Sequence, residues 1–376
     1  MPVDIKQTPP GGNLRDFLDI VDYIYRDDPN FVRPLDMDLK GKLSPKNPFF
    51  EHAEGVIFTA YRNGWCVGRC TAQLDRAYVE RYQENTGFFG YLDTINDEDV
   101  AKALLDAAAE WLAARGCTRM RGPFMLSTSD TEVGCLIDGF DTPPAVMMAH
   151  HRPYQAGLIE KAGLAKMKDA YAWRYPIGDI PKRARKAHEL VQAMPNVVAR
   201  QVDAKNVERD VRIFMDVYND AWSDNWGFIP MTEAELAKMA KEMKLILDPN
   251  LTLIVEIDGV PAGVSFALPN LNEIIADLNG KLFPIGLPKL LWRLKFSPPQ
   301  SARLIILGIR KKYRNMKKYA ALSTYIYSEI DQNAFRAGYK WGELSWTLED
   351  NHPVNLGIKF MGGKIYKRYR FFERDL

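Results

Sequence analysis

Two segments of the chain share one pattern of apolar and polar positions. Residues 57–73 form two β-branched and aromatic runs around Asn63-Gly64, and residues 253–267 form two similar runs around Asp258-Gly259. An Asn-Gly or Asp-Gly pair between two apolar runs is the strongest short signal for a β-hairpin. The repeated pattern therefore predicts that each half of the chain contains a matching hairpin.

A helical pattern follows each hairpin. In residues 97–116, apolar side chains recur at three- and four-residue spacing after an acidic start, and residues 319–338 end in the same way. Gly116 and Gly338 are predicted C-terminal caps. With an aromatic-rich helix before each hairpin, each half is predicted to run helix, hairpin, strand, helix, strand, short helix, strand. This order indicates a mixed α/β or α+β fold repeated in tandem.

The proline-containing, basic segment 176–200 joins the two halves, and we place the boundary near residue 180. The predicted domains are residues 1–180 and 181–376. The second half gains residues between its hairpin and its helix, and this insertion covers residues 278–304. The first half has a longer loop before its last short helix.

Charge is distributed unevenly along the 376 residues. The formal net charge is only +2, yet residues 278–328 contain eleven Lys or Arg and no Asp or Glu. Such a band predicts an anionic partner, which the total charge conceals. The four cysteines form no CxxC pair and no signal peptide is visible, so we expect reduced thiols and a cytoplasmic protein.

The insertion combines this positive charge with large apolar side chains. Residues 287–296 are predicted to form a short helix with an apolar face and a cationic face. One interpretation is contact with an anionic membrane surface, at the inner face of the membrane. The other is an amphipathic flap packed on its own domain. Nucleic acid is not an expected partner, because the aromatic residues form no stacking platform.

The order of elements resembles the GCN5-related N-acetyltransferase (GNAT) superfamily, and the tandem resembles its two-domain members. The resemblance is strongest in LIILGIRKKYRNMKKYAALSTYIY and in WTLEDNHPVNLGIKFMGG. Together with DAWSDNWGFIP and the lipophilic insertion, these segments look similar to the bacterial ceramide synthase-like N-acyltransferases. The resemblance implies acyl-CoA as a co-substrate, no permanently bound cofactor, a long acyl donor and a lipid amine acceptor.

The same resemblance implies a donor site after the third strand of the second half. A loop there offers backbone N–H groups to a pyrophosphate, and nearby cations pair with it. Lys317 and Tyr319 stand where the family has small residues, so two donors stay open: coenzyme A, held by side chains, or an acyl carrier protein. The expected donor residues are Leu307, Gly308, Ile309, Arg314, Asn315, Lys317, Lys318, Tyr319 and Asn351.

Acyl transfer to an amine needs a base for the amine proton. Glu343 and Glu349 are candidates, because they are six residues apart and would share one face of a regular strand. Surface carboxylates paired with lysines are the alternative. The family's usual tyrosine acid aligns with Ile358, which leaves Tyr366, Tyr327 or water as proton donors.

The first half lacks a glycine loop and is acidic at the equivalent position, so we expect it to shape the acceptor site. An aromatic pocket with carboxylates suits a cationic amine. The expected acceptor residues are Trp222, Trp226, Phe228, Asp130 and Tyr154. For the tryptophans, a helix end packed by aromatic side chains is the alternative. No His, Cys, Asp or Glu spacing satisfies a metal site.

These observations predict an N-acyltransferase that moves an acyl group from a thioester to an amine. A non-catalytic acyl-CoA or lipid-binding protein stays open, because the loop glycines and the usual tyrosine are absent.

Overall fold

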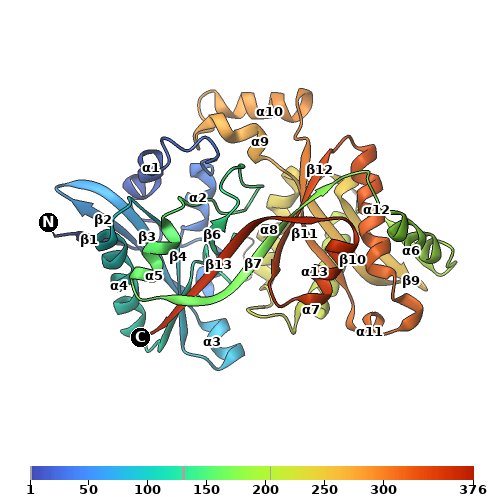
Figure 1. Ribbon diagram of the computed structural model, residues 1–376, viewed down its shortest axis with the longest axis horizontal. Helices are drawn as coiled ribbons and strands as arrows, with labels where there is room; N and C mark the ends of the chain where they lie inside the picture. Colours follow the sequence, from blue (N-terminus) through green and yellow to red (C-terminus); the bar gives the residue numbers. More distant parts are fainter. Residues whose placement is uncertain (1, 129–131, 204) are drawn as a thin grey trace. The chain divides into compact units, whose positions relative to one another are not determined.

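The computed structural model describes residues 2–128, 132–203 and 205–376, which form two compact units. Unit 1 contains residues 1–170, 274–296 and 367–376, and unit 2 contains residues 171–273 and 297–366. Figure 1 shows the elements of both units. Each unit is built from separate stretches of the chain. The predicted domain boundary near residue 180 stays a prediction.

Unit 1 is an α/β unit whose strands follow the order β1-β2-β3-β4-β5-β13. Its elements are β1 (Asp4–Thr8), α1 (Arg15–Ile24), α2 (Asp36–Lys42), η1 (Pro48–Glu51), β2 (Ala53–Arg62), β3 (Trp65–Asp75), α3 (Arg76–Tyr82), β4 (Thr86–Thr94), α4 (Glu98–Ala113), β5 (Arg119–Gly122), β6 (Cys135–Asp138), α5 (Gln155–Lys161) and the start of β7 (Ala165–Pro176). Most of the second-half insertion also belongs to unit 1, as α9 (Asn272–Ile275), η3 (Ala276–Leu278) and α10 (Gly286–Phe296), and so does most of β13 (Lys364–Asp375).

Unit 2 repeats the arrangement, with the strand order β7-β12-β11-β10-β9-β8. Its elements are the end of β7, α6 (Lys182–Gln192), β8 (Val197–Arg200), α7 (Val207–Trp222), α8 (Glu233–Ile246), η2 (Pro249–Leu251), β9 (Thr252–Ile257), β10 (Val260–Pro269), β11 (Ser301–Ile309), α11 (Lys311–Arg314), η4 (Lys317–Tyr319), α12 (Leu322–Arg336), β12 (Trp341–Leu348), α13 (His352–Phe360) and the start of β13. The predicted order of elements is confirmed in both halves.

Both predicted hairpins are present, and both turn as their sequences require. Asn63 and Gly64 have φ values of 53° and 78°, and Asp258 and Gly259 have values of 54° and 73°. Two consecutive positive φ values define the turn that matches the twist of antiparallel strands. Gly116 and Gly338, also at positive φ, follow α4 and α12 as expected.

Helices cover both faces of each sheet because neighbouring strand residues point to opposite sides. In unit 2, Val255 packs with the core residues of α12, whereas Ile254 packs with Val217 of α7. In unit 1, Phe58 and Ala72 pack with Leu104 of α4, while the side chains on the other face meet α1.

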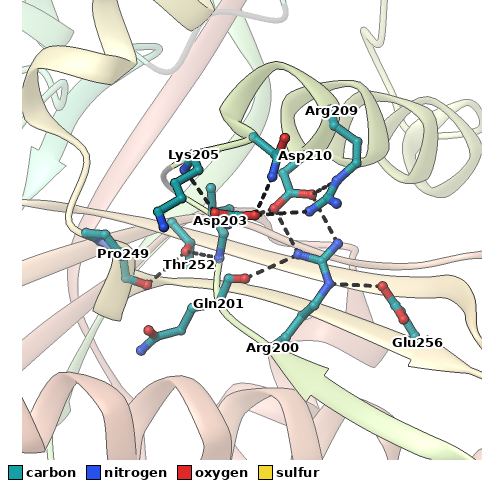
Figure 2. A network of polar contacts seen from close by, with 11 residues as sticks. Arg200, Gln201, Asp203, Lys205, Arg209, Asp210, Pro249, Thr252 and Glu256 are labelled. Atoms are coloured by element: carbon teal, nitrogen blue, oxygen red, sulfur yellow. Dashed lines mark hydrogen bonds and ion pairs between the residues drawn. The ribbon is translucent and has the colours of Figure 1, made fainter.

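A polar network fixes α7 to β8 in unit 2 (Figure 2). Arg200 donates two hydrogen bonds to the buried carboxylate of Asp210, at 2.8 and 3.0 Å, and a third to Glu256 at 3.0 Å. The backbone N–H of Asp203 donates to Asp210 at 2.8 Å. Burial opposes ionisation of Asp210, but these hydrogen bonds outweigh it and lower its pKa to about 2. The network therefore fixes the start of α7, the helix that also contacts the basic segment after β11.

Candidate active site

The two central parallel strands of unit 2 separate along their length. β11 pairs with β12 from Ser301 opposite Trp341 to Leu304 opposite Leu344, although the strands continue to Ile309 and Leu348. Among the described residues, the pairing of these two strands ends at Leu304 and Leu344, so their remaining residues do not continue this ladder. Such groups can bind an extended ligand that lies between the strands.

Glu343 lies at the start of this separation and is fully buried. Its carboxylate accepts hydrogen bonds from the hydroxyls of Ser345 and Tyr366. The buried guanidinium of Arg303 lies 3.5 Å from Glu343 Oε1 and donates to Ser345 at 2.8 Å. A buried charge requires a partner, and Arg303 and Glu343 provide one for each other.

The sequence analysis named Glu343 but missed Arg303. The available signal was a single arginine inside the apolar run SARLIILGI, which would be costly in a buried strand without an acidic partner. Tyr366 is half-buried, so its hydroxyl connects the buried carboxylate to a more exposed position.

Glu349 and Asn351 lie beyond the end of β12, at the start of α13. Glu349 therefore lies outside the strand, and the alternation of side chains along β12 does not apply to it. The expectation that Glu343 and Glu349 share one strand face thus does not hold. Asn351 is the N-terminal cap residue of α13, with no side-chain capping bond. A second asparagine is more firmly held: Asn355 accepts from Thr347 at 2.7 Å and donates to the carbonyl of Leu348 at 2.9 Å. Sequence reasoning missed Asn355.

The basic segment after β11 is bound to the acidic side of α7. Arg310 pairs with Asp216. The backbone N–H of Lys311 donates to Asp220 at 2.7 Å, and its ammonium lies 2.5 Å from Asp224. Asp220 and Asp224, the two carboxylates of the DAWSDNWGFIP segment, thus bind the basic segment after β11.

The other predicted donor residues fall into two groups. Arg314 donates to the backbone carbonyls of Ile309, at 2.7 Å, and Ala221, and Tyr319 is buried in a core cluster that Leu307 and Ile309 also contact. Lys317 and Lys318 are exposed, as is Asn315. Within the turn, the N–H groups of Tyr319 and Ala320 already donate to Met316 and Lys317. Exposed lysine side chains are therefore the groups best placed to meet phosphates.

Trp222 packs directly against β11. A Cβ atom on Gly308 would lie 2.2 Å from Trp222 Cζ3, so only glycine leaves room for the indole. Trp222 stacks on Tyr218 with ring centroids 4.7 Å apart, and Tyr218 contacts Phe228 edge-on at 5.5 Å. Phe228 and Tyr218 thus form the core of an aromatic cluster on which Trp222 packs, and Trp222 and Trp226 are both half-buried.

The remaining acceptor candidates belong to unit 1. Tyr154 donates its hydroxyl to the carbonyl of Thr94 at 2.8 Å, and burial raises its pKa. Asp130 lies outside the described residues. The described residues contain no group of three or more His, Cys, Asp or Glu that could hold a metal ion.

A small cavity of about 40 Å³ lies behind Glu343 in unit 2. Apolar side chains line most of it, and Tyr175, Tyr327 and Asp331 also border it. Asp331 accepts from the backbone N–H of Gly178 at 2.9 Å through one oxygen, and the Tyr175 hydroxyl lies close enough to the carboxylate to influence its pKa. Burial raises the pKa of Asp331. The volume exceeds that of one water molecule, and the polar atoms provide partners for it.

Comparisons with known proteins define the class of this fold. A tandem GNAT protein from the clavulanic acid pathway matches with a TM-score of 0.60 and 12% identity, covering 100% of this chain and 98% of the other. A GNAT from Sphaerobacter thermophilus matches with a TM-score of 0.56 and 13% identity, covering 99% and 95%. No family model matches the sequence. The fold is a tandem GNAT fold, as predicted.

Sequence comparison identifies the family within this class. The bacterial ceramide synthase of Caulobacter vibrioides is 41% identical over 367 residues, covering 96% of this chain and 95% of that protein. Protein YghO of Escherichia coli is 37% identical over 364 residues, covering 97% and 93%. The chain belongs to the same family as these two proteins, and it is a GNAT-type N-acyltransferase.

Proposed function

We propose that the protein transfers a long acyl group from acyl-CoA to the amino group of a long-chain, sphingoid-type amine. The observation that carries this proposal is the separation of β11 from β12 beside the buried Glu343. The name of the Caulobacter relative supports the choice of acceptor, and the exposed Lys317 and Lys318 after β11 support a phosphate-bearing donor.

The chemistry requires one bond to form as another breaks. The amine nitrogen attacks the thioester carbonyl carbon, the C–N bond forms and the C–S bond breaks. The departing thiolate takes a proton from water, and the proton that the amine loses to the enzyme is returned to water, so that none is gained or lost overall. In this proposal the Tyr366 hydroxyl takes the amine proton and passes its own to Glu343. Arg303 and Ser345 hold the carboxylate in place for this transfer.

The test measures thiol release from palmitoyl-CoA in the presence of sphinganine, with the amide product identified by mass spectrometry. We expect Glu343→Gln and Tyr366→Phe to lower kcat by about 10²- to 10⁴-fold, the usual contribution of acid–base catalysis. Glu349→Gln tests the second candidate base separately. Glu189→Gln is the control, because Glu189 is an exposed carboxylate on α6.

Each outcome has a distinct meaning. Because Glu343→Gln leaves Arg303 without its charge partner, melting temperatures accompany every rate. Tyr366→Phe removes no charge and keeps the test valid if Glu343→Gln unfolds. Full activity of both variants would exclude this proton route. Turnover with palmitoyl-acyl carrier protein but not with palmitoyl-CoA would identify the carrier protein as the donor. Binding without turnover would refute the proposal of catalysis on these substrates.

A further inference from the structure

Helix α10 in unit 1 combines cations that pair with the chain's own groups and large apolar side chains that are exposed. Lys289 pairs with Asp277, and Arg293 donates to both oxygens of Asp277 and to the carbonyl of Ile274. These two cations therefore face the chain's own backbone and carboxylate. The predicted short helix is present as α10, and two of its cations pair with Asp277, which is itself half exposed.

Several large apolar side chains of the same helix are exposed. Leu291 and Trp292 are each 58% exposed, and Phe296 is 62% exposed. The loop before the helix adds Phe283 at 70% and Ile285 at 73%. We call these five side chains, together with Leu294, the α10 patch. Exposed aromatic and aliphatic side chains gathered in one short segment mark an interaction surface.

The patch is firmly attached to unit 1. The backbone N–H of Asp36 donates to the carbonyl of Gly280 at 2.9 Å, and a Cβ on Gly280 would lie 2.7 Å from the guanidinium of Arg33. Leu278 and Leu282 are buried on the inner side. The outward position of the apolar side chains is therefore a product of folding around Asp277 and Gly280.

Charge and size indicate which partner the patch fits. The exposed Lys281 and Lys295 flank it, and no acidic residue occurs between residues 278 and 328. A stable protein interface uses about 20–30 residues a side, whereas this patch is confined to one short helix and the loop before it. Trp and Phe beside lysines are the side chains that favour the boundary between lipid headgroups and acyl chains.

We propose that the α10 patch docks unit 1 on the surface of a bilayer that contains anionic phospholipid, with Trp292 and Phe296 inserted at the headgroup boundary. The described chain contains no helix long and apolar enough to span a membrane, so the contact is interfacial. The proposal does not depend on the acyl-transfer activity.

Sedimentation of the full chain with vesicles tests the proposal. The vesicles are phosphatidylcholine alone, or phosphatidylcholine with 30 mol% phosphatidylglycerol. We expect binding to the anionic vesicles, weaker binding to the neutral ones, and a loss of about tenfold or more in Trp292→Ser/Phe296→Ser. Trp65→Ser is the matched control, because Trp65 is a 78% exposed tryptophan outside the patch and is expected to leave binding unchanged.

The variants avoid Lys289 and Arg293, since reversing those charges would break the contacts with Asp277. Equal sedimentation of the wild type and the double variant, with matching melting temperatures, would overturn the proposal. Equal binding to both kinds of vesicle would overturn its electrostatic part. Self-association of the wild type that the double variant loses would assign the patch to a second copy of the chain instead.

Discussion

Individual buried carboxylates in unit 2 differ in whether the surroundings compensate their charge. Glu343 has Arg303 beside it, and Asp210 has Arg200. Asp331 has the backbone N–H of Gly178 and the nearby Tyr175 hydroxyl, but burial outweighs these contacts and raises its pKa. The cost of burying a charge depends on these partners rather than on burial itself.

This contrast predicts that Asp331→Asn and Asp210→Asn change the free energy of unfolding in opposite directions. The pKa of Asp331 is raised in the folded state, so its contribution to stability is greatest at low pH and is lost as pH rises above the unfolded value. Asp331→Asn keeps an acceptor for Gly178 and removes the charge. We expect it to stabilise the fold by about 1 kcal/mol at pH 7–8. Urea unfolding at pH 4 and pH 8 measures this, and an equal loss at both pH values would contradict it.

Asp210→Asn is the counterpart. The pKa of Asp210 is lowered to about 2, so its stabilising contribution is present above about pH 4 and disappears as pH falls through 2. We expect this variant to lose about 2 kcal/mol of unfolding free energy at pH 7. The same urea measurements apply. A stability equal to that of the wild type at neutral pH would refute the role of the Arg200 contacts.

At the scale of elements, the site depends on a close approach between α7 and β11. Gly308 has no side chain, and Trp222 occupies the space where a Cβ would lie. The helix brings Asp216 and Asp220, and the turn after it brings Asp224, to the basic segment that follows β11. The position of the basic segment after β11 is thus set by α7, a helix that precedes it by about 90 residues in the chain.

Gly308→Ala tests this approach. The added methyl would overlap the indole of Trp222, so we expect a loss of about 1–3 kcal/mol, the usual cost of overpacking. Trp222→Leu in the same chain would make room and recover part of that loss. Unfolding free energies of the two single variants and the double variant form a double-mutant cycle. Additive losses would contradict direct contact between the two residues.

At the scale of the whole molecule, each compact unit contains chain segments from both halves of the sequence. Unit 1 includes residues 367–376, and Phe372 to Asp375 of β13 pair with β5. Tyr369, Phe371 and Phe372 are fully buried there. A chain cut at the repeat boundary would remove these residues from the core of unit 1.

We therefore expect residues 1–180 alone to be unstable, although they contain a complete copy of the repeated pattern. The fragment lacks β13 and α10, and it would expose the aromatic positions that β13 covers. Circular dichroism and urea unfolding of the fragment check this, with the full chain as control. A cooperative transition at the urea midpoint of the full chain would show that residues 1–180 fold independently.

The sequence by itself determined the repeat, the order of elements and the hairpin turns, because these depend on local periodicity and on residues that tolerate positive φ at Asn63-Gly64 and Asp258-Gly259. It also named Glu343. Only the tertiary structure decided that Arg303 accompanies Glu343, that Asp220 binds the segment after β11, and that the large apolar side chains of α10 are exposed. Periodicity defines the two faces of a helix but not the inward one. That choice depends on Asp277 and Gly280, whose surroundings are formed by long-range packing.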